Sequence, residues 1–248
     1  MRFTILVTSF ALLFLGACAT FPADRIQPTL NMKWLSQDVR PNGAVKYDKP
    51  SVQTDLTLTH PNGVYVGLLD YAGANDADLS SNKGDEIDYT IGYRTAVGPM
   101  KLDAGFSYFD SFELWNGSRG NILRCYGDAS VPITAGDHTL ALYLRPEFRF
   151  PASGAQPEAG AWLIGGVRHR WEIAEFLNFR QGVSVNHDTG FAGLDSGFIG
   201  SYEAHVNIPL SKVVSFDAIS LRVYTPLSPL DDNRQTETAL GAGIIVRF

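Results

Sequence analysis

The sequence predicts an all-β protein, a transmembrane antiparallel up-and-down β-barrel of about twelve strands. Three observations predict it. Apolar residues alternate with polar or small residues along most of the chain, which is the two-residue period of a strand. The segments between these strands are alternately short and long. No stretch after residue 20 approaches the roughly 18 consecutive apolar residues that a membrane-spanning helix needs.

The first residues have the composition of an export signal. Arg2 precedes an apolar run from Ile5 to Leu15, which is too short to span a membrane and ends in small residues. We therefore expect a signal peptide over residues 1–19 and a single barrel domain over residues 20–248.

Two processing routes remain open at this signal. Cleavage after an Ala-x-Ala exit would leave Thr20 as the new N-terminus. Alternatively, Leu15-Gly16-Ala17-Cys18 resembles a bacterial lipobox, in which Cys18 is acylated and becomes the first residue. We favour lipidation at Cys18, because a thiol in an export signal is otherwise unexplained.

Segments with the strand period follow one another from residue 29 to the last residue. The phase of the alternation slips near Ala218-Ile219, which predicts a β-bulge there. The expected strands are 29–37, 49–59, 63–72, 85–96, 99–110, 119–131, 138–150, 160–171, 175–186, 198–209, 212–225 and 236–248.

The connections sort into two classes. Those after even-numbered strands are short, as at 60–63 and 97–99, whereas those after odd-numbered strands are longer and more polar, as at 38–48 and 73–84. A transmembrane barrel has this asymmetry, with short periplasmic turns and long extracellular loops. An even number of strands then places both termini in the periplasm.

The polar face of the strands is expected to line the lumen. An Arg or Lys that faces lipid near the bilayer midplane costs roughly 2–4 kcal/mol, so the charges must point inward, where opposite signs can pair across strands. The charges expected to line a pore are Asp55, Asp88, Arg94, Lys101, Asp103, Arg124, Asp128, Arg145, Glu147, Arg149, Arg168, Arg170, Arg180, Glu203, Asp217, Arg222, Glu237 and Arg247.

The last expected strand ends on an aromatic residue. Leu240, Ala242 and Ile244 alternate with glycines and polar residues, and the strand ends at Phe248. This ending resembles that of Gram-negative outer-membrane β-barrels, whose assembly machinery recognises a final Phe. The resemblance implies an outer-membrane location, contact with outer-membrane lipid, and Phe248 as the signal to the barrel-assembly machinery.

Residues 34–110 also resemble small outer-membrane porins of the TorF type. The resemblance implies a porin-like barrel and no known catalytic chemistry. The matching segments are Trp34-Leu35-Ser36-Gln37-Asp38, Pro50-Ser51-Val52-Gln53, Asn62-Gly63-Val64-Tyr65-Val66-Gly67 and Glu86-Ile87-Asp88-Tyr89-Thr90-Ile91-Gly92-Tyr93.

Composition and motifs narrow the function classes. The net charge of −6 argues against nucleic-acid binding, which needs a basic footprint. Once Cys18 is acylated or removed with the signal, Cys125 is the only free cysteine, so we expect no disulfide framework. The sequence has no Gly-rich phosphate loop, zinc spacing or haem motif, so no cofactor is expected. Acidic residues around 73–84 could attract Ca²⁺, but their spacing is not that of an EF-hand, and we expect no metal site.

The favoured function is passive passage of small solutes, with lumen charge setting selectivity and no enzymatic activity. Twelve strands enclose little free space, so the pore would be narrow or filled by its own charges. One alternative is a closed structural or surface-interaction barrel without transport. The other is a barrel hydrolase that uses His187 with Asp188 and Ser184 near the extracellular mouth.

Overall fold

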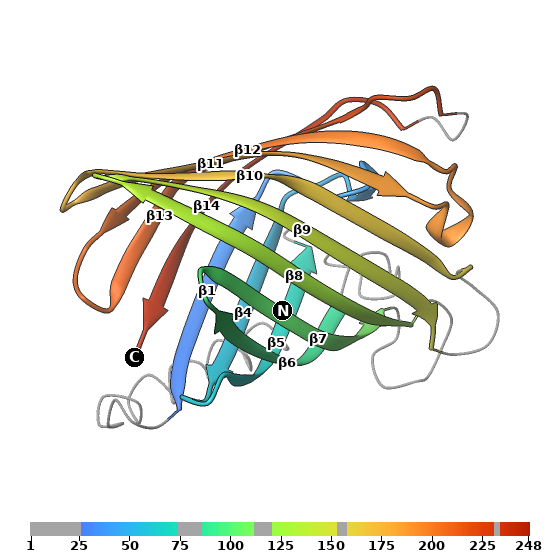
Figure 1. Ribbon diagram of the computed structural model, residues 1–248. Helices are drawn as coiled ribbons and strands as arrows, with labels where there is room; N and C mark the ends of the chain where they lie inside the picture. Colours follow the sequence, from blue (N-terminus) through green and yellow to red (C-terminus); the bar gives the residue numbers. More distant parts are fainter. Residues whose placement is uncertain (1–25, 74–85, 112–120, 153–157, 231–233) are drawn as a thin grey trace.

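The computed structural model describes residues 26–73, 86–111, 121–152, 158–230 and 234–248, and these form a closed antiparallel barrel of twelve strands (Figure 1). Neighbouring wall strands follow the order of the chain, and β1 closes the barrel by pairing with both β4 and β14. The wall strands are β1 (Gln27–Leu35), β4 (Ser51–Thr59), β5 (Val64–Gly73), β6 (Glu86–Val97), β7 (Met100–Ser111), β8 (Ile122–Ala135), β9 (His138–Pro151), β10 (Gly160–Ala174), β11 (Leu177–Asp188), β12 (Gly197–Pro209), β13 (Val214–Pro226) and β14 (Glu237–Arg247).

Two short elements do not belong to the wall. A small hairpin of β2 (Asp38–Val39) and β3 (Val45–Tyr47) interrupts the connection between β1 and β4, and a 3-10 turn, η1 (Phe191–Gly193), follows β11. Where the structure describes the chain, it contains no helix long and apolar enough to cross a membrane. The predicted all-β antiparallel barrel is confirmed.

The twelve expected strands correspond one to one to the twelve strands of the wall, with differences at their ends. The largest is in β8, which runs on to Ala135, although we expected the turn to begin at Pro132. A Pro is tolerated there because β7 pairs with β8 only as far as Ser130. Beyond that point β8 has a free edge, so the missing N–H of Pro132 breaks no ladder hydrogen bond.

The connections have the expected asymmetry. The turns at 60–63, 98–99, 136–137, 175–176 and 210–213 lie at one end of the barrel, together with Phe248, and the longer connections that the structure describes in full, 36–50 and 189–196, lie at the other end (Figure 1). Gly98 and Gly136 begin the two-residue turns with φ of 57°, in the left-handed region that favours glycine. The N–H of Phe248 donates to the Pro28 carbonyl at 3.1 Å, so both ends of the wall lie at this short-turn end.

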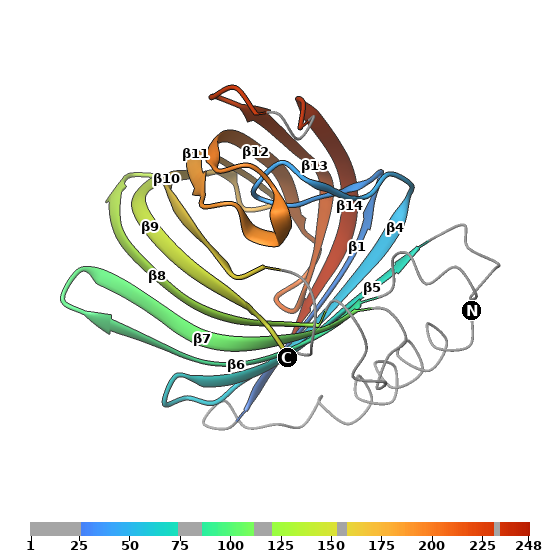
Figure 2. The ribbon, with the colours of Figure 1, turned by 90° about the vertical axis from the view of Figure 1, so that its right-hand side faces the viewer.

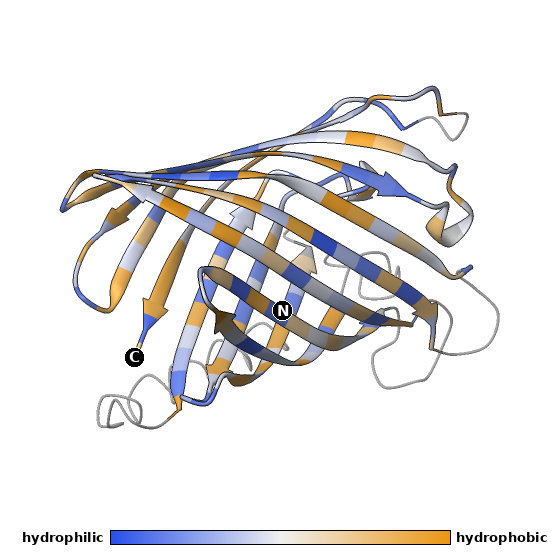
Figure 3. Ribbon diagram, in the orientation of Figure 1, coloured by the Kyte–Doolittle hydropathy of each residue, from blue (hydrophilic) through white to orange (hydrophobic). Residues whose placement is uncertain are grey.

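The two faces of the wall differ as the alternation predicts. Orange and blue bands alternate along the strands in Figure 3, and large apolar side chains such as Phe106 and Leu142 are 63% and 56% exposed on the outside. The predicted β-bulge is confirmed: Val206 pairs with Ile219 and Asn207 with Asp217, which leaves Ala218 unpaired. The extra residue lets Asp217 be buried while Ile219 is exposed.

Candidate functional site

Several ion pairs identify the inner face of the wall. Arg168 on β10 pairs with Asp128 on β8 at 2.9 Å, and Lys33 on β1 pairs with Asp217 on β13 at 3.2 Å. In each case one strand lies between the partners. Side chains of second-neighbour strands reach each other only on the concave side of a curved sheet, so these four residues face inward.

A compact charge cluster occupies the inner face on β8 and β9. The carboxylate of Glu147 accepts from Arg145 at 2.8 Å and from Arg149 at 3.0 Å, and it lies 4.0 Å from Arg124. The guanidinium of Arg149 also lies 3.5 Å from the centre of the Trp162 ring, a cation–π distance. Glu147 and Arg149 are buried, so this part of the interior is filled by protein.

The other expected lumen charges on β4–β7 and β14 form local contacts or lie toward the openings. Asp55 accepts a hydrogen bond from Thr57 at 3.0 Å, and Arg94 pairs with Asp103 at 2.8 Å. Glu237 accepts from Gln37 at 3.1 Å, and Arg247 donates to Ser215 at 3.3 Å. Of the remaining two, Asp88 is buried and Lys101 is exposed.

A basic wall covers the inner face of β10–β13 in the half of the barrel near the short turns. Strand register places Arg170 directly opposite Arg180, and Arg180 opposite His205. The next row holds Arg168 and Glu203, which face each other across Gly182, and then Arg222. We call Arg168, Arg170, Arg180, His205 and Arg222 the basic wall.

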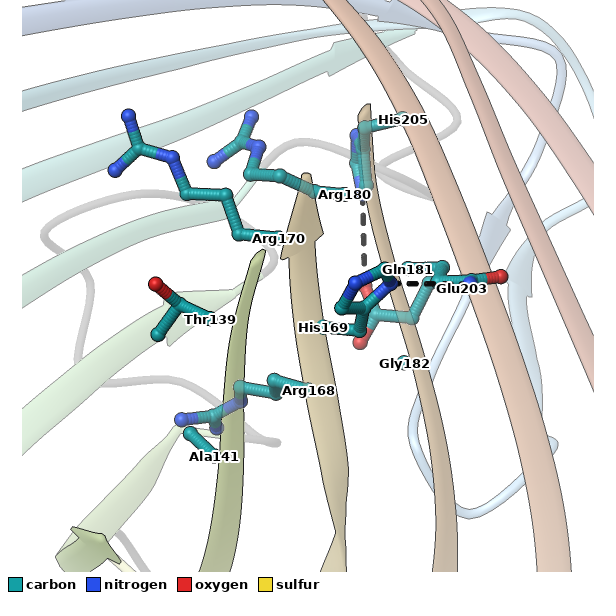
Figure 4. Close-up of a pocket in the computed structure, with 10 residues that line it drawn as sticks. All are labelled: Thr139, Ala141, Arg168, His169, Arg170, Arg180, Gln181, Gly182, Glu203 and His205. Carbon is teal, nitrogen blue, oxygen red and sulfur yellow. Dashed lines mark hydrogen bonds and ion pairs between the residues drawn. The ribbon is translucent and has the colours of Figure 1, made fainter. Parts of the chain in front are cut away.

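A cavity of about 250 Å³ opens onto the basic wall, and the side chains of Arg168, Arg170 and Arg180 extend to the same side of it (Figure 4). Only part of their charge is compensated. Arg170 pairs with Glu172 at 2.8 Å, and Glu203 lies 3.7 Å from His205. Among the described residues, no carboxylate lies within ion-pair distance of Arg180. Like charges directly opposite each other destabilise a sheet, so Arg170 facing Arg180 leaves a place for an anion.

The small hairpin between β1 and β4 folds back into the long-loop end of the barrel. The Asn42 amide donates to Asp188 at 3.0 Å, and Arg234 donates both to Asp188 and to the Asn42 carbonyl at 3.0 Å. Asp188 ends β11, four strands along the wall from β1, and is fully buried. Figure 2 shows the blue hairpin segment beside the orange segment that follows β11.

A second contact fixes the hairpin to another part of the wall. Arg40 donates to Glu86 of β6 at 2.7 Å and lies 3.6 Å from Asp38. Burial lowers the pKa of Arg40, but the carboxylates of Glu86 and Asp38 outweigh it and hold that pKa well above its ordinary value. Because β6 and β11 lie on either side of β1 around the barrel, the hairpin crosses part of the long-loop mouth.

The residues of the hydrolase alternative are not brought together. His187 packs against Phe198, with ring centres 4.6 Å apart, on the outer face. Asp188 points inward to Asn42, and Ser184 shares a 2.6 Å hydrogen bond with Ser201. His187 also belongs to β11, which ends at Asp188 and not at residue 186 as expected, so His187 is a strand residue and not a loop residue.

The other sequence-based expectations give little further chemistry. In the part of the chain that the structure describes, no three His, Cys, Asp or Glu side chains are grouped as metal ligands. The loop acids Asp76, Asp78 and Asp85 lie outside the described residues, as do Cys18 and the whole of 1–19. Cys125 pairs in register with Phe106 and Phe148 on the outer face.

Sequence reasoning missed Lys33, His205 and the hairpin contacts. Lys33 could have been found, because it alternates with the apolar Met32 and Trp34 in the first strand. The alternation puts His205 on the same face as Glu203 but gives it no partner, and the structure pairs it with Asp217 at 3.1 Å. Nothing in the sequence indicates a contact for Asn42, because polar residues are common in loops.

Comparison with known proteins gives structural relatives only. No family model and no curated protein sequence matches the chain, so the TorF resemblance stays an expectation. The NanC porin matches 88% of this chain and 98% of its own, with 9% identity and a TM-score of 0.58. The KdgM porin matches 89% and 99%, with 12% identity and a TM-score of 0.56.

Two further structures extend this picture. An outer-membrane channel from Pseudomonas putida F1 matches 92% of this chain and 97% of its own, with 12% identity and a TM-score of 0.53. KdgM has also been solved in complex with disordered oligogalacturonate, at 12% identity and a TM-score of 0.54. The fold of this chain is that of the outer-membrane porin-like barrels.

Proposed function

We propose that this protein is an outer-membrane channel through which small solutes diffuse passively, with a preference for anions. The observation that carries the proposal is the Arg170–Arg180 pair, two like charges in register on the inner face, of which Arg180 has no carboxylate partner among the described residues. Two like charges directly opposite each other destabilise the sheet unless an anion occupies the space between the guanidinium groups.

The arrangement suits passage better than tight binding. Guanidinium groups replace part of the hydration shell of a carboxylate or phosphate, and Arg168, Arg170 and Arg180 offer successive contacts along the wall. Glu203 beside Arg222 limits the positive potential, so that a bound anion can leave. The oligogalacturonate held by KdgM, a chain of sugar carboxylates, is an anion of this chemistry.

The described contacts favour small solutes. The β2–β3 hairpin crosses part of one mouth, and the Arg145–Glu147–Arg149 cluster fills part of the interior. Twelve strands enclose far less space than the roughly 16 of open aqueous porins. We therefore expect a small conductance.

Reversal potentials in planar bilayers under a KCl gradient test the proposal. The refolded protein should conduct and favour chloride, and Arg180→Gln should move the reversal potential toward that of potassium. Lys212→Gln, an exposed residue of the 210–213 turn, is the matched control and should leave the potential unchanged. A conducting protein with equal potentials in wild type and Arg180→Gln would refute the anion preference. Absence of any current would favour the closed-barrel alternative.

Location and processing belong to the same proposal. The protein should fractionate with outer membranes, with its short turns and both termini in the periplasm, and folded protein should change gel mobility on boiling. If Cys18 is acylated, labelled fatty acid should be incorporated, and Cys18→Ser should abolish the label. A mature N-terminus at Thr20 would instead show ordinary cleavage.

A further inference from the structure

A row of polar side chains interrupts the apolar outer face of β9–β12. His169 on β10 lies in register with Gln181 on β11 and with Leu140 on β9, which is 43% exposed. Gln181 alternates with Val183, which is 59% exposed on the outside. His169 and Gln181 are therefore on the opposite face from the basic wall, and Figure 4 shows the bond between them.

These side chains form one directed chain of hydrogen bonds. Tyr202 donates its hydroxyl to the Gln181 carbonyl oxygen at 3.2 Å, and the Gln181 amide donates to His169 Nδ1 at 3.2 Å. A neutral His169 then carries its proton on Nε2, which lies 3.0 Å from His138 Nδ1 and donates to it. It follows that a neutral His138 carries its proton on Nε2, at the open end of the chain.

The open end lies at the short-turn end of the barrel, where we expect membrane and water to meet. His138 is the first residue of β9, directly after the two-residue turn 136–137, and its side chain is exposed. Its ring stacks on Trp171, with centres 5.3 Å apart, and Trp is enriched at membrane interfaces. Within the part of the chain that the structure describes, nothing accepts a hydrogen bond from His138 Nε2.

Polar groups that face lipid need partners, because hydrocarbon offers none. Each side chain inside this chain of hydrogen bonds has a partner on either side, and the chain ends in the Nε2 donor of His138. A metal ion does not fit, since Nδ1 of His138 and both nitrogens of His169 are already occupied by hydrogen bonds. What fits is an acceptor at the depth of Trp171, and the strongest acceptor at that depth in a bilayer is a lipid phosphate.

We propose that His138 Nε2 donates to the phosphate of a phospholipid bound to the outer face of β8–β11. The neighbouring outer surface suits acyl chains, because Ile133 on β8 is in register with Leu140 on β9, and the two side chains are 59% and 43% exposed. This site is on the other side of the wall from the basic wall, so it does not depend on the proposed transport function, although it rests on the proposed outer-membrane location.

Native mass spectrometry of the detergent-solubilised protein with added phosphatidylglycerol tests this site. His138→Phe keeps an aromatic ring beside Trp171 but removes the donor, and should weaken binding of one phosphatidylglycerol by roughly tenfold. Leu144→Phe, six residues along the same outer face of β9, is the control and should bind as wild type. The change of gel mobility on boiling verifies that all three proteins are folded.

Three further measurements separate the alternatives. Diacylglycerol with the same acyl chains lacks the phosphate and should bind wild type as weakly as phosphatidylglycerol binds His138→Phe. Equal phosphatidylglycerol affinity in wild type and His138→Phe, or equal affinity for the two lipids, would overturn the proposal. A loss of protein dimers or trimers in the lipid-free His138→Phe variant would also overturn it, because this surface would then bind a second copy of the protein. Binding of inorganic phosphate as tight as that of the lipid would overturn it as well.

Discussion

The strictest test of the two-faced wall compares one substitution at adjacent positions of β9. Leu142 is 56% exposed on the outer face, whereas Ala141 lines the cavity at the basic wall, directly opposite Arg168. Arg at position 142 should enter the hydrocarbon, and Arg at position 141 should enter the lumen. The two positions lie at nearly the same depth, so the comparison isolates the face.

The magnitude follows from the position of Leu142 in its strand. It lies four residues after His138, where β9 begins. At about 3.4 Å per residue and a tilt of about 40°, this places it roughly 10 Å above the turn, near the middle of an apolar band about 25 Å tall. We therefore expect Leu142→Arg to lower the free energy of unfolding by about 2–4 kcal/mol. Repulsion from Arg168 should cost Ala141→Arg no more than about 1 kcal/mol.

The assay is reversible unfolding in guanidinium chloride from lipid vesicles, followed by tryptophan fluorescence and by gel mobility. Both variants must reach the same folded baseline before their midpoints are compared. Equal losses at the two positions, or a larger loss for Ala141→Arg, would show that β9 does not present Leu142 to lipid. The assignment of faces in every neighbouring strand would then be wrong as well, because the register links them.

Three further substitutions test individual contacts. Asp217→Asn leaves Lys33, which is only 7% exposed, without its carboxylate partner. This should lower the free energy of unfolding by about 3–5 kcal/mol, and adding Lys33→Met should recover much of the loss. Asp188→Ala removes the anchor of the β2–β3 hairpin and should raise single-channel conductance, while the folded protein still changes its gel mobility on boiling. An unchanged conductance would mean that the hairpin does not restrict the solute path. Gly243→Ala would place a methyl carbon 2.4 Å from the Met32 carbonyl oxygen, and should cost about 1–3 kcal/mol in the same unfolding assay; a neutral effect would contradict the close approach of β1 and β14.

Most of the wall was predictable because alternation is a local property. The strand period located all twelve strands, and the change of phase at Ala218 located the bulge. The same reasoning would make Gly243 a tolerant position on the lumen side, since alternation alone cannot show that the backbone of β1 approaches it. Which strand edges remain free is also non-local, and for this reason β8 could continue through Pro132.

The candidate sites were less predictable, because they depend on pairings between strands distant in sequence. The alternation alone assigns Arg170, Arg180 and His205 to the inner face. That they lie side by side across three strands follows only from the register of β10, β11 and β12. The contact between Asn42 and Asp188 joins residues 146 apart and depends on how a loop folds back. His138 and His169 are 31 residues apart in the chain, and only the pairing of β9 with β10 brings their rings together.

The seam between β1 and β14 determines when the barrel can become a closed object. It joins Thr29 to Arg247 and Leu35 to Gly241, so the cylinder has two open edges until the last strand is in place. Closing so long a loop is costly in chain entropy and is expected to come late. The β2–β3 hairpin is enclosed by that closure, because its anchors on Asp188 and Arg234 lie beyond the seam. These contacts therefore join the two sides of the seam a second time, at the long-loop mouth, and help to hold β1 and β14 together once the barrel has closed.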